Sequence, residues 1–279
     1  MHTSTVRTLL VRGMIAGVVA GLLAFALAYV VGEPSIDSSI ALEESQSAPA
    51  HEHGDAAPAP AEQPAGEPAE EEEELVTRPV QSTFGLATGV LVYGVALGGI
   101  ASLAFALCLG RVGRLRPRAT AALVAAAAFT TVYLVPFLKY PATPPAVGNP
   151  DTIGKRTTLF FLMIALSVLI AVVAVIAGRR LAPKLGNWNA TVVAGGGYVV
   201  VMAVACLLLP ANTDAVQETF PAALLWEFRL ASLAVQALLW TAFGLIFGAL
   251  AERALRPADD RGTGQDPEAL TGASAARTG

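Results

Sequence analysis

Residues 84–118 read FGLATGVLVYGVALGGIASLAFALCLGRVGRLRPR, and this stretch decides the class of fold. Its first part, residues 84–109, contains no charged residue. It exceeds the roughly 20 apolar residues that a helix needs to cross a hydrocarbon core about 30 Å thick. Its last part contains four arginines and no acid: Arg111, Arg114, Arg116 and Arg118. An apolar run followed by a basic segment is typical of a transmembrane helix that ends on the cytoplasmic side.

The same kind of apolar run recurs on both sides of this stretch. Of the 279 residues, 54% are hydrophobic and only 14% are charged, whereas about a quarter of a soluble domain is charged. We therefore predict an all-α integral membrane protein, a bundle of about six transmembrane helices within a polytopic domain at residues 1–256. The predicted spans are residues 9–31, 84–109, 119–138, 157–178, 190–209 and 230–250.

The charges in the connections predict the topology. Every second connection is basic, and the others are acidic or mixed. Because basic connections stay in the cytoplasm, both the N terminus and the C terminus are predicted to be cytoplasmic. The polar tail, residues 257–279, is predicted to be a disordered cytoplasmic segment. Besides the arginines at residues 111–118, the basic residues of the predicted cytoplasmic segments are Arg7, Arg12, Arg179, Arg180, Lys184, Arg253 and Arg256.

The first run has two interpretations. A basic segment precedes it, and Ala-Leu-Ala at residues 26–28 is similar to a signal-peptidase site. The run is longer than the apolar segment of a usual signal peptide, however, and its glycines recur every four residues, which favours a retained helix that packs closely. Cleavage would leave five spans. Glycines at this spacing are Gly13, Gly17 and Gly21, and the pairs Gly85/Gly89, Gly94/Gly98 and Gly244/Gly248.

The connection at residues 33–82 is predicted to be a long, acidic, disordered outer loop. Its middle is rich in Ala, Pro and Glu, includes five consecutive acids at residues 70–74, and cannot bury enough apolar surface to fold alone. Within it, His51, His53 and Asp55 could bind a divalent transition metal. A solvated polar linker explains the same residues, and this alternative stays open.

The predicted outer membrane boundary offers further oxygen ligands. Gly32 and Pro34 are expected to end the first helix, which places Glu33 at the boundary and Asp37 four residues on. This pair is either an interfacial cap or a ligand pair at a pore mouth.

Two further outer connections contribute candidates. Four prolines make residues 139–150 a stiff loop that could shape an entrance or serve as a structural cap. Speculatively, Glu227 pairs with Lys139, and Arg229 pairs with Glu33, because ionisable groups at the membrane need partners. The complete set of candidate metal ligands is His51, His53, Asp55, Glu33, Asp37, Asp151, Glu218 and Glu227.

Several classes of protein are disfavoured. No predicted span has an Asp, Glu, His or Lys at its middle, which argues against a proton relay or a mid-membrane carboxylate metal site. The chain has no nucleotide-binding P-loop and no common hydrolase motif. We expect no enzyme activity, no permanently bound cofactor and no nucleic-acid partner.

Three stretches resemble one known family. They are RGMIAGVVAGLLAFALAYVVGEPSIDSSIALEE (12–44), VPFLKYPATPPAVGNPDTIGKRTTLF (135–160) and LPANTDAVQETFPAALLWEFRLASLAVQALLW (209–240). Together they are similar to the CbtA-type proposed cobalt transporter subunits. The resemblance implies a bacterial cytoplasmic-membrane protein linked to cobalamin supply, with a small single-span CbtB-type partner whose end is histidine-rich.

The expected function is therefore a permease subunit that moves Co²⁺ or, alternatively, Ni²⁺. Two other classes stay open: a membrane scaffold or sensor that binds metal without transport, and a membrane enzyme acting on lipid, for which catalytic residues are missing.

Overall fold

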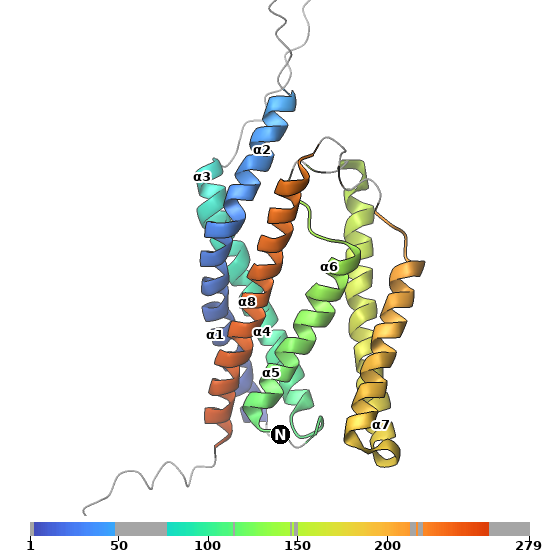
Figure 1. Cartoon of the computed structure of the whole chain (residues 1–279). Helices are drawn as coiled ribbons and strands as arrows, with labels where there is room; N and C mark the ends of the chain where they lie inside the picture. The colour runs from blue at the N-terminus through green and yellow to red at the C-terminus, as the bar shows by residue number, and fades with distance from the viewer. Residues whose placement is uncertain are drawn as a thin grey trace, which may run out of the picture. The chain divides into compact units, whose positions relative to one another are not determined.

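The computed structural model of the chain describes residues 3–47, 77–113, 115–145, 147, 150–212, 216 and 220–256. All regular structure in this part of the chain is helical, and no strand occurs in it (Figure 1). The elements are α1 (Thr3–Leu27), η1 (Ala28–Gly32), α2 (Glu33–Ser47), α3 (Arg78–Val80), η2 (Gln81–Gly85), α4 (Leu86–Cys108), α5 (Pro117–Ala128), η3 (Phe129–Leu134), α6 (Val135–Lys139), η4 (Pro150–Thr152), α7 (Ile153–Leu208) and α8 (Ala222–Leu255).

Five helical segments are long and apolar enough to cross a membrane. The chain is therefore an all-helical protein with several candidate spans, as its composition predicts. These candidate spans are Thr3–Ser45, Arg78–Cys108, Pro117–Lys139, Ile153–Leu208 and Ala222–Leu255.

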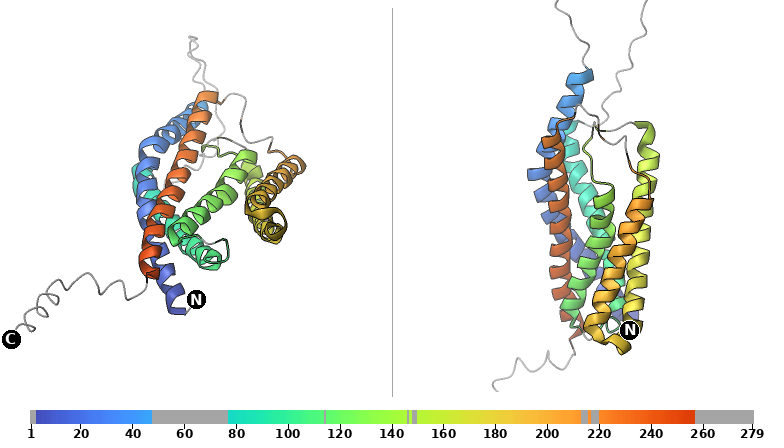
Figure 2. Two further views of the ribbon diagram at one scale, coloured as in Figure 1. Left: turned by 60° about the horizontal axis from the view of Figure 1, so that its bottom comes forward. Right: turned by 45° about the vertical axis from the view of Figure 1, so that its right-hand side comes forward.

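Helix α7 is folded back on itself. A straight helix of its 56 residues would be about 84 Å long, far more than a bilayer needs. Gly186 breaks the helix with φ 77° and ψ 159°, a backbone conformation that residues other than glycine rarely adopt. The two legs then run side by side, as Figures 1 and 2 show, and the Ser167 and Tyr198 hydroxyls lie 2.8 Å apart between them.

The first helix does not end at Pro34, so that prediction is wrong. The chain continues from α1 through the π-helical η1 into α2, and the Glu33 N–H bonds to the Ala28 carbonyl, five residues back. Proline lacks an N–H and its ring crowds the carbonyl four residues earlier. The wider π-helical turn of η1, just before Pro34, accommodates both the missing N–H and the bulk of the ring. The same arrangement recurs where η3 precedes Pro136.

By their contacts, the residues form two compact units. One comprises Met1–Gly21, Tyr93–Ala128 and Leu239–Gly279, and the other Leu22–Val92 and Phe129–Leu238. In the first unit α1 and α4 touch backbone to backbone, because a Cβ added at Gly94 would lie 2.6 Å from the Gly17 carbonyl oxygen. This confirms the packing predicted from the glycine spacing, although an added Cβ at Gly89 meets nothing within 4 Å.

Helix α8 completes the first unit against α4 and α5. The rings of Phe105 and Phe247 meet edge to face with centroids 5.1 Å apart, and a Cβ at Gly244 would lie 2.9 Å from the Ala125 Cβ. The Arg118 guanidinium forms an ion pair with Glu252. Apolar packing and the ion pair between Arg118 and Glu252 thus hold α8 against α4 and α5.

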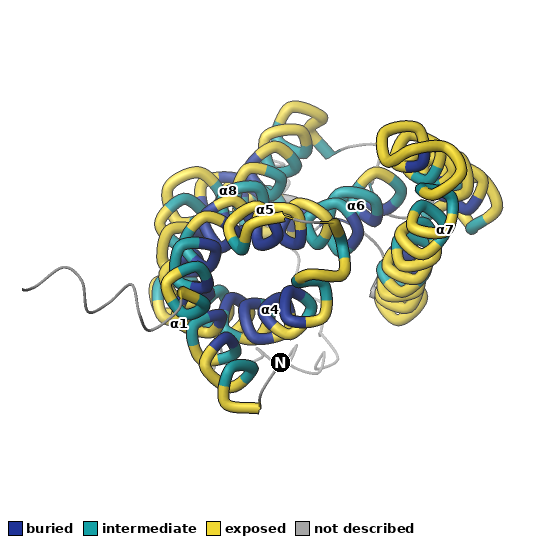
Figure 3. Tube along the Cα trace, turned by 90° about the horizontal axis from the view of Figure 1, so that it is seen from below, coloured by how far each residue is buried: buried dark blue, intermediate teal, exposed yellow. Residues whose placement is uncertain are grey.

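In the second unit, the legs of α7 pack around a small core. Tyr140, Met163, Met202 and Ala205 are buried together. Most other side chains of α7 are exposed (Figure 3). Because the exposed side chains are largely aliphatic, this surface suits a lipid environment rather than water.

Candidate functional site

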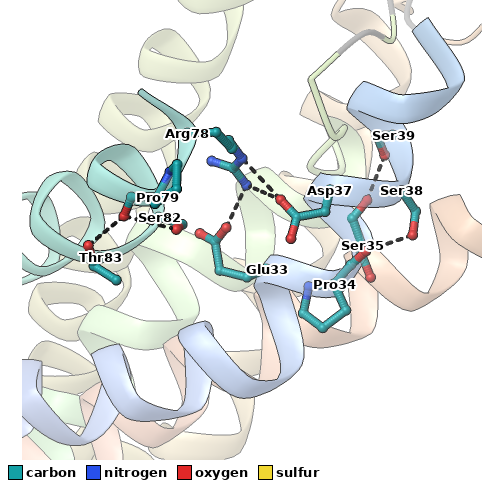
Figure 4. A network of polar contacts seen from close by, with 10 residues as sticks. All are labelled: Glu33, Pro34, Ser35, Asp37, Ser38, Ser39, Arg78, Pro79, Ser82 and Thr83. Atoms are coloured by element: carbon teal, nitrogen blue, oxygen red, sulfur yellow. Dashed lines mark hydrogen bonds and ion pairs between the residues drawn. The ribbon is translucent and has the colours of Figure 1, made fainter. Parts of the chain in front are cut away.

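The most strongly paired polar cluster lies where α2 and α3 meet, in the second unit. The Arg78 Nη2 atom lies 2.6 Å from Glu33 Oε2 and 2.8 Å from Asp37 Oδ1. The Arg78 Nε atom also donates to Asp37 Oδ1 at 3.0 Å. One guanidinium therefore bridges two carboxylates (Figure 4). We call Glu33, Asp37 and Arg78 the acidic junction.

Local helix geometry builds this junction. Because the helix continues through Pro34, Glu33 and Asp37 are four residues apart on one helical face and both reach Arg78. Ser39 anchors the same helix by donating to the Ser35 carbonyl at 2.7 Å. The Glu33 side chain is 10% exposed and that of Asp37 60%. The junction thus has a buried acid and an exposed one.

The charge of the junction does not balance. Two carboxylates face one guanidinium, which leaves one net negative charge at neutral pH. Arg78 uses one oxygen of each acid. The other oxygens, Glu33 Oε1 and Asp37 Oδ2, have no partner among the described residues, so the junction keeps two oxygen atoms able to accept another ligand.

Arg78 was not among the site residues predicted from the sequence. The signal that could have found it is its isolation, because no other lysine or arginine occurs between Arg12 and Arg111. A single base within a long acidic connection is the natural partner for an acid placed at a membrane boundary. The speculative pair of Glu33 with Arg229 is accordingly wrong.

The proline-rich loop forms a second polar region of the same unit. The Tyr140 hydroxyl donates to the Pro210 carbonyl at 2.9 Å, and the Arg229 Nε atom donates to the Ala142 carbonyl at 3.3 Å. Burial, together with the nearby Cys206 thiol, raises the pKa of the Tyr140 phenol. The phenol therefore stays protonated at neutral pH and can keep donating. These two bonds fix the loop against the 210–212 segment and α8.

Two cavities lie beside this loop, with volumes of about 280 and 360 Å³. Both are bordered by Tyr140, Pro141 and Asn212. The smaller one is also lined by Lys139 and Arg229, and the larger one by Arg156. No acid of the described residues lines either cavity. We call the smaller cavity the basic pocket.

The other predicted ligands are dispersed or lie outside the described residues. Asp151 is exposed in η4, and Glu227 is exposed near the start of α8. Glu227 forms no ion pair with Lys139, which contradicts that speculative pairing. His51, His53, Asp55 and Glu218 lie outside the described residues. Within the described part, no three His, Cys, Asp or Glu side chains gather closely enough to hold a metal.

Comparison with known proteins gives one match. The model of a family described as "Probable cobalt transporter subunit (CbtA)" matches residues 6–252, which include the acidic junction and the basic pocket. No curated protein and no solved structure matches the chain.

Proposed function

Because the chain belongs to the CbtA family of probable cobalt transporter subunits, we propose that it is the membrane subunit of a bacterial cobalt uptake system that supplies cobalamin synthesis. The single observation that carries this proposal is the family match over residues 6–252. The apolar helices add the physical requirement for transport, a body that can reside in a membrane.

The proposed topology has six crossings with both termini in the cytoplasm. Each leg of α7 then crosses separately, since each is at least as long as the roughly 20 residues that a span requires. The turn at Gly186 follows Arg179, Arg180 and Lys184 closely, which supports a cytoplasmic turn. By the same alternation, α2 and the acidic junction face outward.

In this arrangement a metal ion enters at the acidic junction. The acidic outer connection raises the local concentration of cations. Glu33 Oε1 and Asp37 Oδ2 then offer two oxygen ligands. We propose that His51, His53 and Asp55 of the same connection complete the set, since imidazoles suit Co²⁺ and Ni²⁺. Asp151, Glu218 and Glu227 are less favoured, because the cationic basic pocket adjoins the proline-rich loop.

Radiolabelled ⁵⁷Co²⁺ uptake tests the proposal. Cells that express the chain with a single-span CbtB-type protein should accumulate submicromolar cobalt faster than cells with either protein alone. Deletion of residues 51–55 should raise the apparent KM, and excess Ni²⁺ measures how far nickel competes. Background uptake in every combination would rule out the permease.

A second candidate, a scaffold or sensor that binds metal without transporting it, is favoured by one observation. Two buried serine hydroxyls of the described spans are already engaged: Ser102 donates to the Gly99 carbonyl, and Ser167 bonds Tyr198. A route for a cation would need such groups free. Metal binding to the purified protein without uptake would favour this candidate.

A further inference from the structure

We propose that the basic pocket binds a phosphate-type anion, between Lys139, Arg229 and Asn212. Its volume of about 280 Å³ leaves room for a phosphate group and the first atoms of an attached alcohol. The other described residues of its wall are Tyr140, Pro141, Ala211 and Val216. The proposal concerns a site other than the acidic junction and does not depend on cobalt being the cargo.

The charge of the basic pocket favours an anion. Lys139 and Arg229 are half-buried, and no carboxylate of the described residues lies within ion-pair distance of either. Lys139 rests near its neighbour's ring, with Nζ 5.8 Å from the Tyr140 centroid. Partly desolvated cations without an opposite charge are costly in a membrane protein. A bound anion would offset that cost.

The hydrogen-bond donors of the basic pocket also suit a phosphate. The Arg229 Nε atom bonds the Ala142 carbonyl, which fixes the guanidinium and leaves its two terminal nitrogens for a ligand. A guanidinium can hold a phosphate with two parallel hydrogen bonds, and a lysine adds a point charge. The Asn212 amide supplies a neutral donor on the same wall. Three donors of this kind match the oxygens of one phosphate.

The neighbouring cavity of about 360 Å³ extends the basic pocket. It shares Tyr140, Pro141 and Asn212 with the basic pocket, and its other walls include Tyr133, Phe137 and Phe160. The basic pocket therefore adjoins a larger cavity that is lined by aromatic rings and by one cation, Arg156. This pairing fits an amphiphile whose phosphate occupies the basic pocket, but free phosphate has the same recognition chemistry. The source of the phosphate is therefore decided by experiment.

Native mass spectrometry of the full-length protein, purified and stripped of lipid, tests the proposal. The protein would be titrated with phosphatidylglycerol, with phosphatidylcholine and, by calorimetry, with inorganic phosphate. Tighter binding of phosphatidylglycerol identifies an anionic lipid headgroup as the source. Binding of inorganic phosphate alone identifies a free anion. Binding of none of the three probes, or equal binding of the two lipids without phosphate binding, overturns the proposal.

Variants locate the site. Lys139→Gln and Arg229→Gln should each weaken binding about tenfold or more, because each removes charge-assisted hydrogen bonds. Arg229→Lys, which keeps the charge, should retain part of the affinity. Lys155→Gln is the matched control, because Lys155 is an exposed cation of the same unit that lines neither cavity. Size-exclusion profiles establish that each variant is folded. Folded glutamine variants with unchanged binding would also overturn the proposal.

Discussion

The acidic junction and the basic pocket hold their charged side chains in opposite ways. In the junction, Arg78 holds two carboxylates at 2.6 and 2.8 Å, so its positive charge is neutralised within the fold and one negative charge remains. In the pocket, Lys139 and Arg229 have no carboxylate partner among the described residues. Arg78 is therefore a cation that stabilises the fold, whereas Lys139 and Arg229 are cations available to a ligand. Removing each kind of cation should therefore give different results.

The largest expected effect is the loss of Arg78. Arg78→Ala leaves the buried Glu33 carboxylate without its partner, and we expect the free energy of unfolding to fall by about 2–3 kcal/mol. The measurement is an SDS titration of the purified protein in mixed micelles. Asp37→Asn should cost about 0.5 kcal/mol, because the Asp37 side chain is 60% exposed.

A double variant checks the cause of that loss. Glu33→Gln combined with Arg78→Ala removes the stranded charge and should recover part of the lost stability. An unchanged unfolding curve for Arg78→Ala would mean that the junction contributes little, and its contrast with the basic pocket would disappear.

A smaller effect is expected at the proline-rich loop. Tyr140→Phe keeps the buried ring but removes the bond to the Pro210 carbonyl, and the free energy of unfolding should fall by about 1 kcal/mol. The same variant should weaken anion binding, because Tyr140 and Pro141 wall the basic pocket. Tyr29→Phe, at an exposed tyrosine, is the control. Equal stability of both variants would show that this bond does not fix the loop.

The helical membrane fold could be read from the sequence because it depends on composition along the chain. Uncharged runs of 20 residues or more have few alternatives to a membrane helix. Glycines four residues apart predicted close helix packing, and the structure shows that α1 and α4 are the partners. The prediction that the first helix ends at Pro34 was wrong because the effect of a proline depends on the turn before it. A π-helical turn removes the clash that normally ends a helix, and no residue type predicts such a turn.

The candidate sites were harder to predict than the fold. Glu33 and Asp37 were identified as a pair, but their partner Arg78 lies far along the chain, beyond residues 48–76, which are not described. The basic pocket was missed because its two cations belong to different helices, Lys139 to α6 and Arg229 to α8. Long-range proximity of this kind depends on packing, which a charge pattern in one chain does not encode.

The smallest effect on the free energy of unfolding is expected at Lys139, in the basic pocket. Lys139→Gln should leave the free energy of unfolding within about 0.5 kcal/mol of the original, because no ion pair with a described residue is lost and the desolvation cost of a half-buried cation is relieved. The SDS titration used for Arg78→Ala measures both variants side by side. A loss at Lys139 as large as that at Arg78 would show that Lys139 has a structural partner within the chain. The basic pocket would then resemble the junction, with its charge already neutralised and no need of an anion.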